Sequence, residues 1–215
     1  MPTIKGLLAE YRKKKRKIKK RLREFRIFQR KKDRDIFKEL CFCILTPQSK
    51  AVCCNEAVEA LAGSNLLYRG SILAIRRKLK GLARFHNKKA AYIVEARNIF
   101  EDKQSKKLDI KSKINPEDIL GTREWLVRNI KGLGYKEASH FLRNIGMGRD
   151  ISILDVHILR NLKEFGVIKD IPDSLAKKDY ILIEGRMRDF AVKVGIPLEE
   201  LDLLFWSRKT GFVFK

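Results

Sequence analysis

The sequence predicts an all-α fold, and two observations carry this prediction. Apolar residues recur at intervals of three and four positions, as in Ile36, Leu40, Cys43 and Ile44, which is the spacing of one face of an α-helix. No stretch alternates convincingly between apolar and polar residues, as a half-buried β-strand would. We therefore expect about ten helices, without an internal repeat or a low-complexity linker.

The N-terminal segment is the most basic part of the chain, with a dense run of lysine and arginine from Tyr11 to Lys32. An apolar stripe at helical spacing runs through the same segment: Leu7, Leu8, Tyr11, Ile18, Leu22, Phe25 and Phe28. This combination predicts a packed helix with a solvated basic face rather than a disordered arm.

Further helices are expected along the rest of the chain. Similar stripes are formed by Val52, Ala57, Val58 and Leu61, and by Ala90, Ile93, Val94 and Ile99. Four prolines stand where helices should begin, because proline suits the first helical turn: Pro47, Pro116, Pro172 and Pro197.

The charge of the chain favours a polyanionic partner. The 215 residues include 49 Lys and Arg against 26 Asp and Glu, a formal net charge of +23 at pH 7. Such an excess favours nucleic acid without choosing DNA or RNA. A membrane is a weaker candidate, because no run of about 18 apolar residues appears and the N-terminus lacks the apolar core of a signal peptide. We expect a soluble intracellular protein, cytoplasmic or associated with the nucleoid.

The four cysteines are expected to be buried thiols. Cys41, Cys43, Cys53 and Cys54 match neither a zinc nor an iron–sulfur spacing, and no histidine lies near them. We therefore expect no metal site and no cofactor.

The most informative stretch runs from Ile130 to Leu142. A helix that ends near Asn129, a tight turn at Gly132 and Gly134, and a new helix that starts near Tyr135 make a helix–hairpin–helix. Glycines suit this turn because it needs backbone angles closed to other residues and lets a phosphate approach the amides of the next helix. Such a turn binds the DNA backbone without reading its sequence.

A second position follows further along the chain, in the segment from Ile153 to Arg160. Asp155 stands at a predicted helix start after an apolar approach, and His157 follows two positions later.

Together these residues resemble the helix–hairpin–helix DNA glycosylases, in which the hairpin ends in a lysine and is followed by an Asp-x-His segment. Lys136 and Asp155 match those two positions. Leu45–Ser49 is similar to the family loop that places a polar side chain in the gap left by a flipped base. Arg84–Ala90 resembles a further family segment.

Within these glycosylases the chain is most similar to the type 2 8-oxoguanine DNA glycosylase/lyases, from about Asp35 to the last residue. Two segments carry the resemblance: Ile130–Gly146, and the C-terminal stretch Leu201–Lys215. Relatives of endonuclease III carry a four-cysteine iron–sulfur cluster near the C-terminus, whereas no cysteine follows Cys54. The type 2 group lacks that cluster, so the resemblance implies excision of 8-oxoguanine and strand cleavage without iron.

The resemblance assigns the chemistry to Lys136 and Asp155. An unprotonated Lys136 would attack the sugar C1′ and form a Schiff base, and desolvation and the nearby helix terminus would favour the neutral amine. Asp155 would stabilise the oxocarbenium-like sugar and shuttle protons. The alternatives are a phosphate contact for Lys136, as for Lys131, and a helix N-cap for Asp155, which is compatible with catalysis.

Other positions are expected to bind the DNA or to recognise the base. His157 would contact phosphate, and Gln48 and Phe85 would fill the gap and wedge the duplex beside the flipped nucleotide, although Phe85 also suits a core position. The resemblance further implies that Arg84 contacts the orphaned cytosine. Candidates for base recognition are Trp206 by stacking, the terminal Lys215, and His140, which equally suits a helix interface.

We expect two helical lobes with a DNA-binding cleft between them. One comprises residues 35–149 and ends in the hairpin, and the other comprises residues 1–34 and 150–215. The expected partner is duplex DNA containing 8-oxoguanine, bound by a monomer without an obligate protein partner.

Three alternative functions remain open from the sequence. A helix–hairpin–helix module without catalysis would explain the charge and the glycines but not Lys136 with Asp155. A basic RNA-binding or ribosomal protein would explain the charge alone. A glycosylase for another lesion, such as an oxidised pyrimidine, would use the same chemistry.

Overall fold

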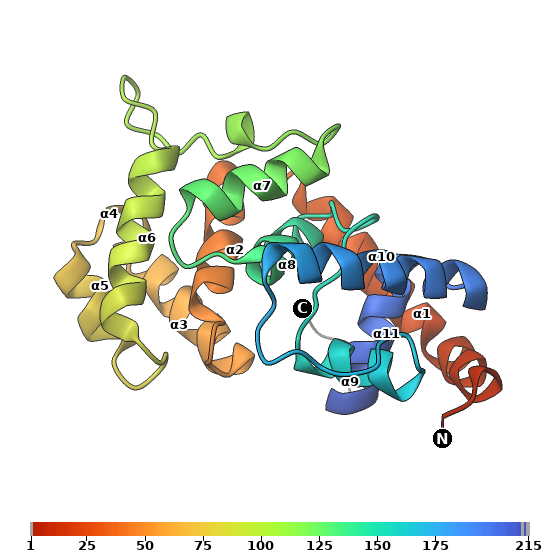
Figure 1. Cartoon of the computed structure of the whole chain (residues 1–215). Coiled ribbons are helices and arrows are strands. Elements are labelled where there is room, and N and C mark those ends of the chain that lie inside the picture. Colours follow the sequence, from red (N-terminus) through yellow and green to blue (C-terminus); the bar gives the residue numbers. More distant parts are fainter. Residues whose placement is uncertain (1, 212, 214–215) are drawn as a thin grey trace. The chain divides into compact units, whose positions relative to one another are not determined.

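The computed structural model describes residues 2–211 and residue 213 of the chain. Its described part contains eleven α-helices and one short 3-10 helix and no β-strand (Figure 1). Glu101 and Leu108 form an isolated antiparallel bridge. The predicted all-α fold is therefore confirmed.

The helices follow one another along the whole chain. They are α1 (Ile4–Phe28), α2 (Asp33–Leu45), α3 (Ala51–Gly63), α4 (Leu66–Arg69), α5 (Ile72–Leu79), α6 (His86–Phe100), η1 (Lys111–Lys113), α7 (Ile119–Asn129), α8 (Tyr135–Asn144), α9 (Val156–Glu164), α10 (Lys177–Val194) and α11 (Leu198–Thr210).

The chain forms two compact units. The hairpin unit comprises residues 30–141, and the terminal unit comprises residues 1–29 and 142–215. The boundaries expected from the sequence, at residues 35 and 149, differ from these. The reason is that α8, the second helix of the hairpin, contributes its first part to one unit and its end to the other.

The core of the hairpin unit is built around α2, which packs against α3 and α6. Its predicted apolar face is fully covered, since Ile36, Leu40, Cys43 and Ile44 are all buried. The stripes of α3 and α6 are only partly covered: Val52 and Ile99 are exposed. Spacing identifies a helical face, but the neighbouring helices decide how much of that face is buried.

In the terminal unit, the basic N-terminal segment forms one long helix, as predicted. Thr3 caps α1 by accepting a hydrogen bond from the amide of Gly6 at 3.1 Å. The stripe of α1 faces inward and packs along α11, with Leu7, Tyr11, Ile18, Leu22 and Phe25 buried. The basic side chains between these positions are mostly exposed.

Only one of the four prolines expected to open helices stands directly before one. Pro197 is the N-cap of α11. Pro47 lies in the turn between α2 and α3, and Pro116 and Pro172 lie in turns ahead of α7 and α10. The prediction is wrong for these three because the fixed φ of proline suits a turn as well as a first helical turn.

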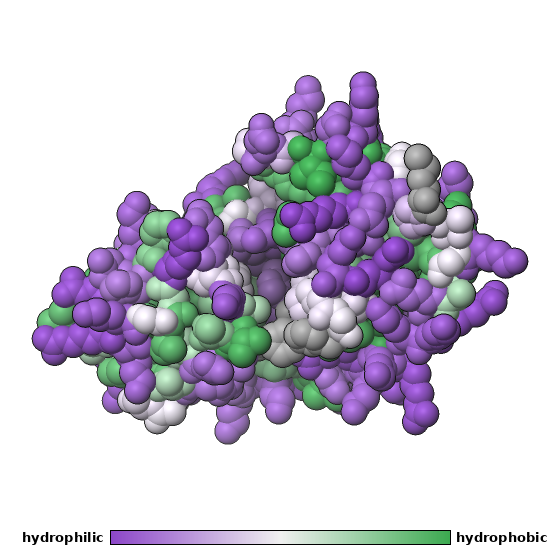
Figure 2. All heavy atoms as spheres, turned by 90° about the horizontal axis from the view of Figure 1, so that it is seen from below, coloured by the Kyte–Doolittle hydropathy of each residue, from purple (hydrophilic) through white to green (hydrophobic). Residues whose placement is uncertain are grey.

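The face of the molecule drawn in Figure 2 is covered mainly by hydrophilic side chains, shown in purple, with hydrophobic side chains in small separate patches. The described part of the chain contains no helix that is both long and apolar enough to cross a membrane.

The four cysteines are free thiols in the hairpin unit. Cys41, Cys43 and Cys54 are buried, whereas Cys53 is half-buried. Burial raises the pKa of Cys41 well above its usual range and that of Cys54 to about 11, although the Lys89 ammonium opposes the shift at Cys54.

We predict that a thiol reagent at pH 8 modifies Cys53 rapidly and the other three cysteines slowly. At that pH, a thiol with a pKa of about 11 is ionised in only about one molecule in a thousand, and the thiolate is the reactive form. Stopped-flow measurement should show one fast thiol, which Cys53→Ser removes, and four reactive thiols in denaturant. Several fast thiols in the native protein would contradict this burial.

Candidate functional site

The predicted helix–hairpin–helix is present in the structure. Helix α7 ends at Asn129 and α8 begins at Tyr135, with the glycine turn between them. Gly132 has a φ of +86°, a left-handed conformation that favours glycine. A Cβ placed on Gly132 would lie 2.7 Å from Cδ2 of Tyr92 on α6. Both its backbone angle and the nearby ring therefore require glycine at this position.

The second glycine of the turn already has a partner. The amide of Gly134 donates to Oε2 of Glu137 at 3.2 Å, so that the carboxylate caps the start of α8. A phosphate at this turn would have to share or displace that contact. The contribution of Gly132 and Gly134 to DNA binding stays a prediction.

Lys136 is the second residue of α8 and stands directly after the turn. Its side chain is 35% exposed, and its Nζ forms an ion pair with Oε1 of Glu137 at 2.9 Å. The Glu137 side chain itself is buried. One buried carboxylate therefore links the turn, the start of the helix and the candidate nucleophile. Glu137 stands three residues after the N-cap position Gly134, which is a known capping signal, and this signal could have identified it from the sequence.

Asp155 is the N-cap of α9, which is the structural role that the sequence offered beside catalysis. Its Oδ1 accepts hydrogen bonds from the amides of His157 at 2.8 Å and Ile158 at 2.9 Å. The capping contact fixes the carboxylate at the positive end of the helix, where a negative charge is stabilised. Its catalytic role stays a prediction.

Buried polar side chains hold the extended segment that leads to Asp155. The amide of Ser152 donates to Oε1 of Glu184 at 2.9 Å, and the hydroxyl of Tyr180 donates to the carbonyl of Ser152 at 2.7 Å. Both partners come from α10. These contacts satisfy backbone groups that neither helix nor sheet would satisfy in an extended segment.

A second anchor of this segment comes from α11. The amide of Ile153 donates to Oδ2 of Asp202 at 2.8 Å, and Nη1 of Arg143 donates to Oδ1 of the same carboxylate at 2.9 Å. Burial raises the pKa of Asp202 to about 6, while Arg143 and the Ile153 amide oppose the shift. The charge of Asp155 also raises the pKa of Asp202.

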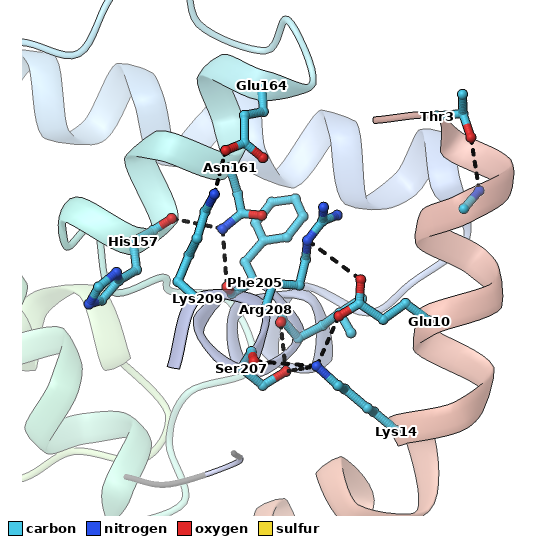
Figure 3. A network of polar contacts seen from close by, with 12 residues as sticks. Thr3, Glu10, Lys14, His157, Asn161, Glu164, Phe205, Ser207, Arg208 and Lys209 are labelled. Carbon is cyan, nitrogen blue, oxygen red and sulfur yellow. Dashed lines mark hydrogen bonds and ion pairs between the residues drawn. The ribbon is translucent and has the colours of Figure 1, made fainter. Parts of the chain in front are cut away.

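Helix α9, which Asp155 caps, is tied to α11 and through it to α1 (Figure 3). Nδ2 of Asn161 donates to the carbonyls of His157 at 2.8 Å and of Phe205 at 3.0 Å. Lys209 pairs with Glu164 across the same two helices. The next ties in this network join α11 to α1: Lys14 bonds to Ser207, and Arg208 pairs with Glu10.

The two aromatic candidates of the terminal unit lie beside each other. The rings of His157 and Trp206 meet edge to face, with centroids 6.5 Å apart. Both side chains are half-buried, and Figure 3 shows the His157 ring pointing away from the polar network. His157, the predicted phosphate contact, thus lies next to Trp206, the residue predicted to stack on the base. Lys215 lies outside the described residues.

In the hairpin unit, the predicted wedge and gap-filling residues have unusual backbone conformations. Gln48 has a φ of 54° and Phe85 a φ of 55°, both in the left-handed region. Phe85 is the N-cap of α6, the residue is 52% exposed, and the guanidinium of Arg84 lies over its ring. Phe85 is therefore not a core residue, which was the alternative.

His140 is half-buried in the hairpin unit. Its ring meets that of Phe42 on α2 edge to face, with centroids 5.6 Å apart. This geometry fits a histidine at a helix interface, and its role in base recognition stays a prediction. Within the described residues, no group of three or more metal-ligating side chains could hold a metal ion.

Comparison with known proteins gives a consistent result. A family model described as Ogg-HhH, 8-oxoguanine DNA glycosylase, matches residues 18–196. The 8-oxoguanine DNA glycosylase/AP lyase of Fusobacterium nucleatum is 45% identical over 206 residues, covering 92% of this chain and 91% of the relative. The enzyme of the same name from Methanocaldococcus jannaschii is 44% identical over 199 residues, with 92% and 91% covered.

Solved structures of similar proteins share the fold. The Methanocaldococcus jannaschii 8-oxoguanine glycosylase/lyase, crystallised with a 15mer DNA containing 8-oxoguanine, has a TM-score of 0.85 and 40% identity, covering 99% of each chain. The 8-oxoguanine DNA glycosylase of Thermotoga maritima has a TM-score of 0.85 and 34% identity, covering 99% of this chain and 98% of the other.

We predict that Gly132→Ala lowers the free energy of unfolding by about 2–4 kcal/mol, because the left-handed angle and the Tyr92 ring both oppose a Cβ. In a Tyr92→Ala background the same change should cost less, since only the backbone term remains. Chemical denaturation of the four proteins measures both terms.

The matched control for this test is Gly63→Ala at the end of α3. That position has an ordinary φ and no atom within 4 Å of an added Cβ, so its effect should stay within about 1 kcal/mol. An equal loss for Gly132→Ala in both backgrounds would contradict the role of the ring.

Proposed function

The chain belongs to the 8-oxoguanine DNA glycosylase family, and from this premise we propose that it excises 8-oxoguanine from duplex DNA and then cleaves the strand. The observation that carries the proposal is the position of Lys136. It is a half-exposed amine directly after the glycine turn of a helix–hairpin–helix, held by the carboxylate of Glu137. Such a turn brings the DNA backbone to the amine.

The proposed reaction uses Lys136 as the nucleophile. Once Nζ has lost a proton and left Glu137, it attacks C1′ of the damaged nucleotide. The bond between C1′ and N9 breaks, its electron pair passes to the base, and the base takes up a proton as it leaves. The attached amine then gives up a proton, the bond between C1′ and the ring oxygen O4′ breaks as the nitrogen electron pair forms the C=N bond, and O4′ takes up a proton, which leaves a Schiff base between Nζ and C1′. Removal of a proton from C2′ then expels the 3′ phosphate by β-elimination.

Asp155 is proposed to stabilise the positive charge that develops on the sugar and to carry protons to and from the amine. Its Oδ1 is fixed by two amides of α9, so the carboxylate needs no reorganisation during the reaction. Lys136 belongs to the hairpin unit and Asp155 to the terminal unit. The proposal requires both to act on the same nucleotide.

Binding and base selection are proposed to be separate. The net charge of +23 and the hairpin supply salt-dependent contacts with phosphates, which carry no sequence information. Trp206, His140 and Lys215 are the proposed groups for recognising 8-oxoguanine, and Arg84 is the proposed contact to the opposite cytosine. We further propose that the protein acts as a monomer in the cell interior.

We predict that sodium borohydride traps the protein on a duplex with 8-oxoguanine opposite cytosine, and that Lys136→Gln abolishes this adduct. Borohydride reduces the Schiff base to a stable amine, so gel electrophoresis counts the covalent complexes. The matched control is Lys78→Gln, which removes an exposed lysine from α5 of the same unit and should leave trapping within a few-fold of wild type.

Undamaged DNA and a duplex with an oxidised pyrimidine complete this experiment. Trapping on the oxidised pyrimidine alone would assign the same chemistry to another lesion. Binding without trapping or base release on either duplex would contradict an enzymatic function and favour a DNA-binding module.

A second prediction separates the two roles of Asp155. Asparagine caps helices as well as aspartate does, so Asp155→Asn should change the free energy of unfolding by less than about 0.5 kcal/mol. It carries no charge, and single-turnover excision should slow by about 100-fold or more. Asp155→Ala should lose the activity and also about 1 kcal/mol of stability. Excision by Asp155→Asn at a rate near wild type would leave Asp155 with capping alone.

A further inference from the structure

Lys89, in the first turn of α6, is a buried cation for which the proposed reaction has no use. Its side chain points into the hairpin unit with only 4% exposure of the residue. The ammonium donates to the carbonyls of Leu45 at 2.7 Å and Pro47 at 2.8 Å, and to Oγ of Ser49 at 3.0 Å. All three hydrogens of the ammonium therefore have an acceptor.

The environment of this cation explains why it is tolerated. Leu45 is the last residue of α2, and the carbonyls at a helix C-terminus carry negative charge without intrahelical partners. Burial lowers the pKa of Lys89, with contributions in the same direction from Arg84 and Lys136, whereas Cys54 and Glu137 raise it. The three acceptors that the Lys89 ammonium contacts belong to the end of α2 and the turn that follows it, and none of these three is a carboxylate.

These contacts join two turns that are distant in sequence. Oγ of Ser49, which accepts from Lys89, also accepts from the amide of Arg84 at 3.0 Å. The turn after α2 and the turn before α6 thereby border one hollow, lined by Gln48, Ser49, Lys50, Cys53, Gly81, Leu82, Ala83 and Arg84.

Each of the two turns carries one residue with strained backbone. Gln48 and Phe85 both have left-handed φ angles, which cost a non-glycine residue about 1–2 kcal/mol. Such conformations persist only where the surroundings fix them. The path from Lys89 through Ser49 to the Arg84 amide connects directly to the neighbours of both residues.

We propose that Lys89 is a positioning residue that presets Gln48 and Phe85 for insertion into the DNA beside the extruded base. The inference rests on the proposed function and on the insertion roles of these two residues. Without the Lys89 ammonium, both turns relax toward ordinary backbone angles and must be reordered in each complex with DNA. Extrusion of the base slows, while the chemistry at Lys136 remains intact.

The test compares Lys89→Met with Lys88→Met. Lys88 is the exposed neighbour on the same helical turn, so that both variants lose one positive charge. Single-turnover excision of 8-oxoguanine from a fully paired duplex should slow about 10-fold or more for Lys89→Met and change little for Lys88→Met. Borohydride trapping on a preformed abasic site, which needs no base extrusion, should stay within about 2-fold of wild type for both.

A duplex with the lesion inside an unpaired bubble provides the rescue. An unpaired base costs less free energy to extrude, so the excision rate of Lys89→Met should come closer to that of wild type on this duplex. Ser49→Ala gives an independent variant, because it keeps the Lys89 charge but breaks the link to the Arg84 amide. It should show the same pattern as Lys89→Met, which keeps the inference testable if Lys89→Met does not fold.

The possible outcomes distinguish the positioning role of Lys89 from the proposed function of the protein. Equal losses in excision and in abasic-site trapping would show that Lys89 acts through global stability or through the charge of Lys136, and would refute the positioning role. Excision by both lysine variants at the wild-type rate would refute it as well. Failure of the wild type itself to excise or trap would instead refute the proposed function, and the inference with it.

Discussion

The unpaired backbone groups at helix ends are the constraint on which the candidate site depends. Every helix leaves amides at its start and carbonyls at its end without intrahelical partners. In this protein, side chains proposed to be functional satisfy several of these groups. Asp155 accepts from two amides of α9, Glu137 accepts from the turn before α8, and Lys89 donates to the last carbonyl of α2. The contacts that stabilise the helices thus also fix the proposed reacting groups.

The surroundings of Asp155 extend this principle to an extended segment. Glu184, Tyr180 and Asp202 bind the backbone of Ser152 and Ile153, and all three are buried. Buried polar groups are costly unless each has a partner, and a partner in one geometry fixes that geometry. The carboxylate therefore stands on a segment held from α10 and α11, although the segment itself belongs to no regular element. This rigidity suits a group that must meet a developing charge without reorganisation.

Sequence patterns predicted the features that depend on neighbours in the chain. The stripe of α1, the glycine turn between Asn129 and Tyr135, and the capping position of Asp155 are all local signals. Contacts between distant residues left no such signal: Lys89 lies among ordinary helix-forming residues, and nothing in the sequence around Arg143 or Asp202 indicates that these two residues pair. The helix start predicted at Pro172 is wrong for a related reason. The fixed φ of proline suits a turn as well as the first turn of a helix, so proline alone does not distinguish the two. The roles of Lys136 and Asp155 came from family resemblance rather than from spacing.

The proposed chemistry is divided between the two units. The hairpin unit carries the proposed nucleophile Lys136 with the residues proposed to enter the DNA, and the terminal unit carries Asp155 and Trp206. A nucleophile without the carboxylate lacks stabilisation of the sugar cation, and the carboxylate without the nucleophile leaves no Schiff base. On this proposal neither unit alone carries both groups. Excision would then require one damaged nucleotide to engage Lys136 and Asp155 together, so that base extrusion and chemistry depend on the same binding event.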